Sequence, residues 1–137
     1  MSGSGYPPEW ALVDVMLAKS SRPGYPERQG IGEEEVDEWI ERCREMGIKS
    51  IICLLSDDQL PFYSELSTDL IQYCRDAGFA VAHVPEEDYK LPPLSDISLE
   101  LVVSAFENLE KPVLVHCSAG IARTGMAVAA IWENEMG

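Results

Sequence analysis

A cysteine and an arginine stand at the junction of an apolar run and a helix-forming segment. Cys117 follows the apolar run 113–115, and Arg123 opens the last helix-forming segment, with five residues between them. Backbone N–H groups of so short a loop point into a concavity that suits phosphate, and the helix N-terminus adds positive potential. The planar guanidinium of Arg123 can hold two oxygens, and the same field stabilises a thiolate at Cys117. We therefore predict an oxyanion cradle with a nucleophile at its floor.

The residues between the cysteine and the arginine form the expected wall of this cradle. Gly120 permits a positive φ or a close approach of a ligand within the loop. We expect phosphate to be bound by Arg123 together with Ser118, Ala119, Gly120, Ile121 and Ala122. No metal and no cofactor is expected, because none of the four cysteines forms a CxxC pair and only two histidines are available as further ligands.

The segments that must position this loop alternate between apolar runs and helical patterns. Continuous apolar strands separated by helices predict an α/β fold, with a central, mostly parallel sheet flanked by helices on both faces. The phosphate-binding loop then lies between the last strand and the following helix. Ligand sites in such sheets lie off the carboxyl ends of the strands, so three loops should meet there. The expected strands are 10–17, 48–55, 79–84 and 113–115, the helices 33–46, 66–77, 95–109 and one from about Arg123, and the loops 56–63, 85–94 and 117–123.

Helical periodicity predicts which side of each helix faces the core. In the segment 33–46 one face carries Val36, Trp39, Ile40 and Cys43. In the segment 95–109 the predicted inward residues are Ile97, Leu101, Ala105 and Leu109.

Length and charge restrict the class of protein. A chain of 137 residues predicts one domain, here 10–137, after a flexible lead-in over 1–9 that is rich in Gly, Ser and Pro. The formal net charge of −14 argues against nucleic acid and against an anionic membrane surface as partners. The lead-in lacks the features of a signal peptide, and unpaired cysteines suit a reducing compartment, so a cytoplasmic location is expected. Nothing in the pattern decides the oligomeric state.

Residues 116–125 read His-Cys-Ser-Ala-Gly-Ile-Ala-Arg-Thr-Gly. This stretch resembles the HC-x5-R-[ST]-G signature of the cysteine-based protein tyrosine phosphatases, and it is most similar to the small dual-specificity branch. The opening of the chain also looks like that branch, in Trp10, Leu17-Ala18 and Arg22-Pro23-Gly24. The resemblance covers about residues 10–136. Members of the branch usually continue with further helices, so a domain ending at Gly137 is expected to be C-terminally shortened.

The resemblance implies a role for each residue at the site. Cys117 would attack phosphorus and form a cysteinyl-phosphate, which Arg123 and the loop stabilise. His116 would support the loop backbone, and Thr124 would hydrogen-bond the sulfur and help it leave. The family's general acid is an aspartate in an upstream loop that often contains prolines. Asp88 fits this position best, with Glu86 and Glu87 as competitors in the same loop.

The expected substrate is a phosphorylated protein or peptide. Asp57 and Asp58 in the loop 56–63 would disfavour highly anionic substrates if they face the site. Related lipid and polyphosphate phosphatases tend to place basic residues at the positions of Ile121 and Ala122. Both residues are apolar here, which favours a phosphoprotein, especially phosphotyrosine, over those substrates. No feature decides between phosphotyrosine and phosphoserine or phosphothreonine, because pocket depth sets that preference. The alternatives are a non-catalytic phosphotyrosine-binding module and a phosphatase acting on a lipid or nucleotide phosphate.

Overall fold

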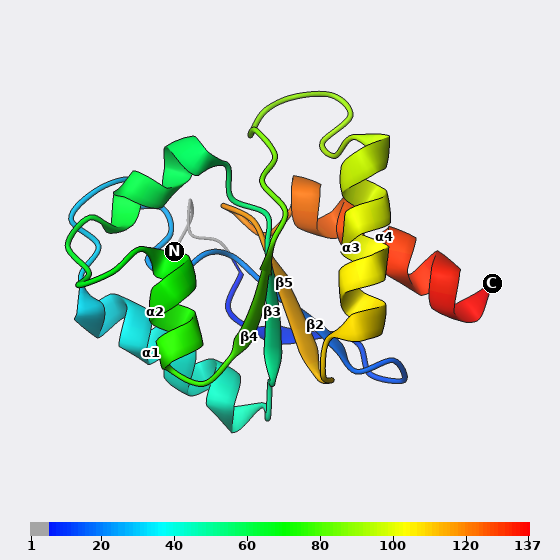
Figure 1. Ribbon diagram of the computed structural model, residues 1–137, viewed down its shortest axis with the longest axis horizontal. Helices are drawn as coiled ribbons and strands as arrows, with labels where there is room; N and C mark the ends of the chain where they lie inside the picture. The colour runs from blue at the N-terminus through cyan, green and yellow to red at the C-terminus, as the bar shows by residue number, and fades with distance from the viewer. Residues whose placement is uncertain (1–5) are drawn as a thin grey trace.

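The computed structural model describes residues 6–137 and contains a five-stranded sheet with helices on both faces (Figure 1). The spatial order of the strands is β1-β2-β5-β3-β4, and only the edge pair β1–β2 is antiparallel. The predicted α/β fold with a mostly parallel sheet is confirmed. The strands are β1 Glu9–Leu12, β2 Leu17–Ser20, β3 Ser50–Cys53, β4 Ala80–His83 and β5 Val113–His116.

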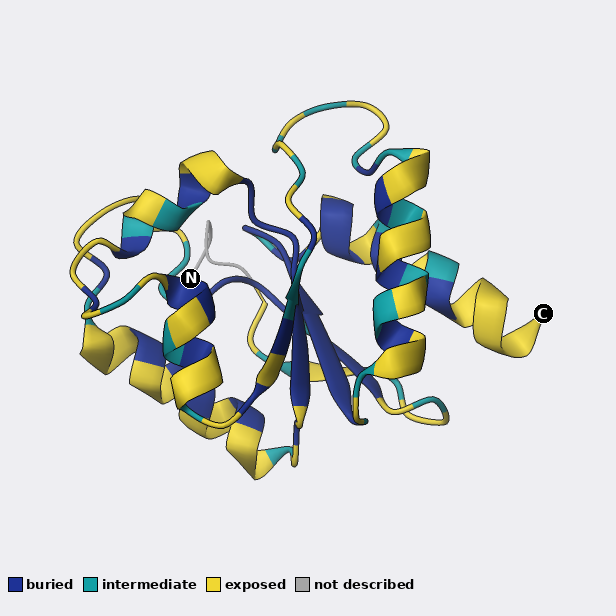
Figure 2. Ribbon diagram, in the orientation of Figure 1, coloured by how far each residue is buried: buried dark blue, intermediate teal, exposed yellow. Residues whose placement is uncertain are grey.

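Two layers of helices bury the sheet between them. One face carries α1 (Glu33–Glu45), the 3₁₀ helix η1 (Asp57–Tyr63) and α2 (Leu70–Asp76), and the other carries α3 (Asp96–Asn108) and α4 (Ala122–Met136). Figure 2 shows buried residues along the central strands and exposed residues on the outer sides of the helices. Strands β3 and β5 are buried at every position, as expected for strands covered on both faces.

The helical periodicity predicted the inward face of α1 correctly and that of α3 in part, since Ala105 and Leu109 pack against the core as predicted. Val36, Trp39, Ile40 and Cys43 of α1 are buried, as predicted. On α3, however, Ile97 is 73% exposed and Leu101 is 52% exposed, whereas Val102 and Phe106 are buried. Two adjacent stripes of α3 are apolar, and the sequence pattern alone ranks them almost equally. Packing favours the stripe with the larger side chain, because burying Phe106 removes more apolar surface from water.

The start of the chain also differs from its prediction. The expected single strand 10–17 is an antiparallel hairpin of β1 and β2, with a turn at 13–16 in which the Met16 N–H donates to the Val13 carbonyl at 3.0 Å. This turn contains the apolar residues Val13, Val15 and Met16, so its sequence resembles a continuation of the strand. Within the expected lead-in, the Tyr6 carbonyl accepts the Ser21 N–H at 2.6 Å and Glu9 begins β1, whereas residues 1–5 lie outside the described part.

The loop predicted at 56–63 is largely the short helix η1. Its first backbone donor is satisfied within the segment, because the Ser56 N–H donates to Gln59 Oε1 at 3.1 Å. The following helix begins at Leu70 rather than at Leu66, although Leu66 is buried as predicted for an inward residue. Among the helices of residues 6–137, none has the length and apolar character needed to cross a membrane.

Candidate active site

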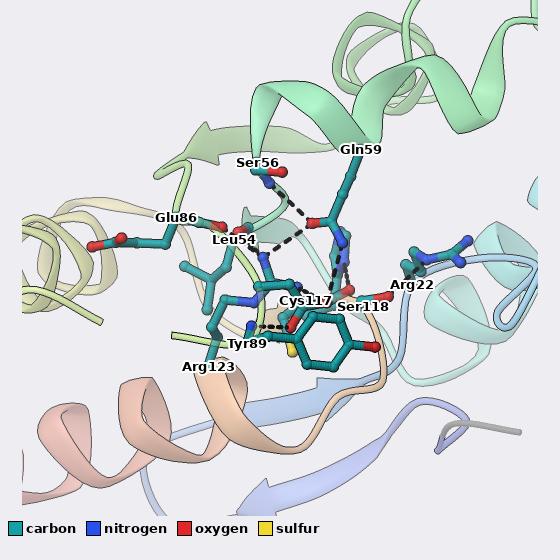
Figure 3. A network of polar contacts seen from close by, with 11 residues as sticks. Arg22, Leu54, Ser56, Gln59, Glu86, Tyr89, Cys117, Ser118 and Arg123 are labelled. Carbon is teal, nitrogen blue, oxygen red and sulfur yellow. Dashed lines mark hydrogen bonds and ion pairs between the residues drawn. The ribbon is translucent and has the colours of Figure 1, made fainter. Parts of the chain in front are cut away.

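The three predicted loops meet at the carboxyl ends of β3, β4 and β5, and the Arg123 side chain connects them. Its Nη1 lies 3.0 Å from the Leu54 carbonyl oxygen, just after β3, and 2.7 Å from the Glu86 carbonyl oxygen, after β4. Arg123 itself lies in the first turn of α4, after the loop that follows β5. Figure 3 shows these residues grouped with Cys117. The prediction that the loops converge is therefore confirmed.

One edge of the Arg123 guanidinium is buried without a hydrogen-bond acceptor. The residue is 1% exposed, and within residues 6–137 neither Nε nor Nη2 has a hydrogen-bond partner. Nη2 forms an ion pair with Asp88 Oδ2 at 3.1 Å, but at an angle that leaves its N–H groups unused. A buried donor without an acceptor is costly. The Nε–Nη2 edge presents two parallel N–H groups, which match two oxygens of a phosphate group.

The loop after Cys117 is tightly packed against the end of β2. Cys117 is 2% exposed, and Gly120 has a φ of +82°. A Cβ on Gly120 would lie 2.7 Å from the Ser20 carbonyl oxygen and 2.7 Å from the Ser21 nitrogen. Glycine is therefore required twice at this position, for its conformation and for space. Of the remaining wall residues, Ile121 and Ala122 are exposed, Ala119 is partly exposed and Ser118 is buried.

His116 and Thr124 are buried on either side of the loop. His116 Nδ1 lies 3.1 Å from the Cys117 carbonyl oxygen, and Trp39 packs edge-on against its ring. Burial lowers the pKa of His116 to about 4, so the ring is neutral near pH 7 and Nδ1 donates to that carbonyl. The Thr124 hydroxyl is buried without a hydrogen-bond partner within the described residues. The hydrogen bond to the Cys117 sulfur that the resemblance implied is thus not formed in this structure.

The three candidate acids in the loop after β4 have different surroundings. The Glu86 carboxylate accepts the Ser95 N–H at 2.8 Å and pairs with Lys90 at 2.9 Å. Glu87 is exposed. Asp88 reaches Arg123 and also accepts a hydrogen bond from Gln59 Nε2 at 3.2 Å. Of the three, only the Asp88 side chain contacts the arginine of the cradle.

Glu86 anchors the loop to the N-terminus of α3. Partial burial raises its pKa, but hydrogen bonds from Ser98, Ser95 and Lys90 outweigh burial and hold the pKa at about 2, against an ordinary value of 4.5. A carboxyl group with this pKa is ionised near neutral pH and has no proton to donate. The structure therefore places the Glu86 side chain in loop anchoring.

Glu86→Gln should destabilise the fold in a pH-dependent manner. Because the folded pKa lies below the unfolded one, the stabilisation is present above about pH 4.5 and is lost as the pH falls toward 2. We expect the free energy of unfolding to fall by about 2 kcal/mol at pH 7. Urea unfolding followed by tryptophan fluorescence at several pH values measures this difference, with Glu87→Gln as the matched control. An equal loss at pH 3 and pH 7 would show that the carboxylate does not anchor the loop by its charge.

Two residues that contact this site were not singled out as site residues from the sequence. Arg22 is 1% exposed, and its Nε donates to Ser118 Oγ at 3.0 Å while its backbone N–H donates to the Ser118 carbonyl at 2.9 Å. Gln59 bridges Arg123 and Asp88. A local signal for Gln59 existed, because Ser56-Asp57-Asp58-Gln59 has the form of a capping box, which marks a helix start.

An acidic cavity of about 340 Å³ adjoins the site. It lies between η1 and the loop after β4. These are the same two segments that contact Arg123. Both Asp57 and Asp58 line it, as does Glu87, and all three are exposed. The full lining is Ser56, Asp57, Asp58, Pro85, Glu86 and Glu87.

Solved phosphatase structures share this fold. A mutant form of Tk-PTP has a TM-score of 0.64 at 22% identity and covers 94% of this chain and 72% of its own. Kinase associated phosphatase, with its catalytic cysteine replaced by serine, has a TM-score of 0.66 at 19% identity and covers 96% and 75%. The catalytic core of the PP-IP phosphatase SIW14 from S. cerevisiae has a TM-score of 0.60 at 16% identity and covers 98% and 70%. At these identities, the likeness establishes the fold.

The family is shown by the sequence. No curated protein matches the chain. The Tc-R-P family profile, described as "Polymorphic toxin system, DSP-PTPase phosphatase", matches residues 29–135. This range contains the loop after β5, the loop after β4 and η1, which together form the site described above. The resemblance to cysteine-based dual-specificity phosphatases is therefore confirmed, and the chain belongs to the Tc-R-P family of DSP-PTPase phosphatases of polymorphic toxin systems.

Proposed function

We propose that this phosphatase hydrolyses phosphotyrosine in proteins through a cysteinyl-phosphate on Cys117. The observation that carries the proposal is the Nε–Nη2 edge of Arg123 at the start of α4, which is buried without a hydrogen-bond acceptor in the part of the chain that the structure describes. Two oxygens of a phosphate monoester would satisfy this edge, and backbone N–H groups of the loop would bind the remaining oxygens. These donors stabilise the charge that develops on the phosphoryl oxygens in the transition state.

In the first step, the Cys117 thiolate attacks phosphorus opposite the leaving oxygen. The S–P bond forms while the bond from phosphorus to the leaving oxygen breaks. Asp88, in its protonated form, gives its proton to that oxygen and becomes a carboxylate. Its position beside Arg123 supports this role, because an acid at the edge of the cradle is close to the oxygen that departs.

In the second step, the Asp88 carboxylate takes a proton from water while the water oxygen attacks phosphorus. The S–P bond breaks, inorganic phosphate leaves and the Cys117 thiolate returns, so protons and charges balance over the cycle. Thr124, whose buried hydroxyl has no hydrogen-bond partner among residues 6–137, would donate to the departing sulfur. No metal enters either step.

Two features favour a phosphotyrosine protein over a more highly charged phosphate ester. Tyr89, next to Asp88, is 87% exposed and offers an aromatic face, and Ile121, in the loop after β5, is 56% exposed. The carboxylates of Asp57 and Asp58 line the adjoining cavity and repel additional phosphates. They favour instead a substrate with a basic residue near its phosphotyrosine.

A peptide panel tests this substrate class. At low salt, kcat/KM should be about five-fold higher for a phosphotyrosine peptide with flanking lysines than for one with flanking glutamates. As NaCl rises to physiological strength, kcat/KM for the acidic peptide should increase, because salt screens the distributed carboxylates more than the direct contacts of phosphate. Phosphate release is measured, and a small aryl phosphate corrects for chloride competition.

The double variant Asp57→Asn/Asp58→Asn is the matched variant for this experiment. It should reduce the preference for the basic peptide without changing turnover of the small aryl phosphate. A monotonic fall with salt for the acidic peptide would contradict the electrostatic argument. Phosphoserine peptides and an inositol pyrophosphate complete the panel, since SIW14 is a PP-IP phosphatase. A highest kcat/KM on the inositol pyrophosphate would assign this chain to a non-protein phosphate.

A further inference from the structure

Gln59 lies between the arginine and the proposed acid of this site. Its Oε1 accepts the Ser56 N–H at 3.1 Å and an Arg123 Nη1 hydrogen at 3.0 Å. Its Nε2 donates to Asp88 Oδ2 at 3.2 Å. Figure 3 shows the Gln59 side chain extending from η1 to Arg123. No other side chain among residues 6–137 hydrogen-bonds both Arg123 and Asp88.

The surroundings leave one orientation for the Gln59 amide. Ser56 N–H and Arg123 Nη1 are donors and need an acceptor, which must be Oε1. The amide nitrogen is therefore directed toward the carboxylate of Asp88. Gln59 is buried and belongs to η1, so its side chain is held by the fold and not by a mobile loop.

Phosphate binding changes which contacts hold Asp88. In the free protein Asp88 Oδ2 has two partners outside its own loop, Arg123 Nη2 and Gln59 Nε2. A phosphate group on the Nε–Nη2 edge would bind the N–H groups of Nη2, and its negative charge would weaken the ion pair between Nη2 and Asp88. The hydrogen bond from Gln59 would then be the main contact that holds the Asp88 carboxylate from outside its own loop.

We propose that Gln59 is a positioning residue that holds the Asp88 carboxyl group at the leaving oxygen once phosphate occupies Arg123. This inference rests on the proposed function, in which Asp88 is the general acid. A positioned acid contributes most when the leaving group is a poor one, because a good leaving group departs without a proton. Loss of positioning should therefore appear as a dependence of kcat on the leaving group.

Gln59→Glu is the most selective variant. A glutamate keeps acceptor oxygens for Ser56 and Arg123, but it places a carboxylate where Asp88 now receives a hydrogen bond. We expect kcat for phenyl phosphate to fall about ten-fold or more, and kcat for 2,4-dinitrophenyl phosphate to change less than about three-fold. Gln59→Leu, which removes all three contacts, should show the same leaving-group dependence, and thermal unfolding shows whether it folds.

Gln72→Leu is the matched control. Gln72 Nε2 also donates to an aspartate, Asp76, at 2.8 Å, but on the exposed surface of α2, so its loss should leave both substrates unaffected. Combining Gln59→Glu with Asp88→Asn should cause little further loss on phenyl phosphate, because both changes remove the same contribution. If the losses of kcat in the two single variants multiplied in the double variant, a shared role of Gln59 and Asp88 would be contradicted.

The outcomes separate this inference from the proposed function. If Asp88→Asn shows a strong leaving-group dependence and Gln59→Glu behaves as the unmodified protein, Gln59 is not a positioning residue and the acid assignment stands. An equal loss of kcat on both aryl phosphates in Gln59→Glu would also overturn the inference, since the substitution would then act through Arg123 alone. If Asp88→Asn itself shows no leaving-group dependence, the acid assignment fails and the inference fails with it.

Discussion

Cys117→Ser should abolish turnover and retain phosphate binding. A serine hydroxyl is not ionised near neutral pH, so it cannot replace the thiolate as nucleophile, and kcat on p-nitrophenyl phosphate should fall by more than about 10³-fold. The proposed phosphate-binding groups, Arg123 and the backbone of the loop, are unchanged. Inorganic phosphate should therefore still raise the unfolding temperature of the variant.

Cys53→Ser is the matched control for this experiment. Cys53 ends β3 beside His116 of β5, so it is the cysteine closest to Cys117 along the sheet. Burial raises the pKa of its thiol to about 12, so this thiol stays protonated and takes no part in the proposed reaction. The kcat of the Cys53→Ser variant should stay within a few-fold of that of the unmodified protein. A kcat of Cys117→Ser within ten-fold of that of the unmodified protein would refute the assignment of the nucleophile. If the unmodified protein were inactive both with and without EDTA, the chain would instead be a phosphotyrosine-binding module.

Asp88→Asn should reduce kcat by about 10²–10³-fold on substrates with poor leaving groups, because an amide cannot donate a proton to the departing oxygen. The loss should shrink for 2,4-dinitrophenyl phosphate. The alkaline limb of the pH–rate profile should also disappear, since that limb reports the loss of the proton from the acid. Steady-state kinetics over an aryl phosphate series and a pH series measure both effects.

The neighbouring carboxylates are the rivals in this test. Glu86 is held ionised at the N-terminus of α3 by Ser95 and Lys90, so Glu86→Gln should reduce stability more than the chemical step. Glu87 is exposed and makes no hydrogen bond in the described structure that would direct it to Arg123. If Glu87→Gln showed the leaving-group dependence and Asp88→Asn did not, the acid would be Glu87.

Some of the architecture could be predicted because its signals are local. The inward face of α1 follows from the spacing of Val36, Trp39 and Ile40, since one helix turn sets which residues share a side. The mostly parallel sheet follows from continuous apolar runs separated by helices. On α3 the same reasoning failed for Ile97 and Leu101, because Leu101 and Val102 are both apolar and only the packing of Phe106 against the sheet selects between their stripes.

By itself the sequence determined that one short loop after a buried strand separates Cys117 from Arg123 at the start of a helix, because their spacing and the flanking patterns are contiguous in the chain. It also determined which three loops meet. Only the tertiary structure decided that Asp88 contacts Arg123, that Glu86 accepts the N–H of Ser95 at the start of α3 and that Gln59 joins the proposed acid to the arginine. The contacts of Asp88 with Arg123 and with Gln59 link segments that lie far apart in the chain. No periodicity or spacing encodes them, because they depend on how η1 and the loop after β4 pack around one buried guanidinium.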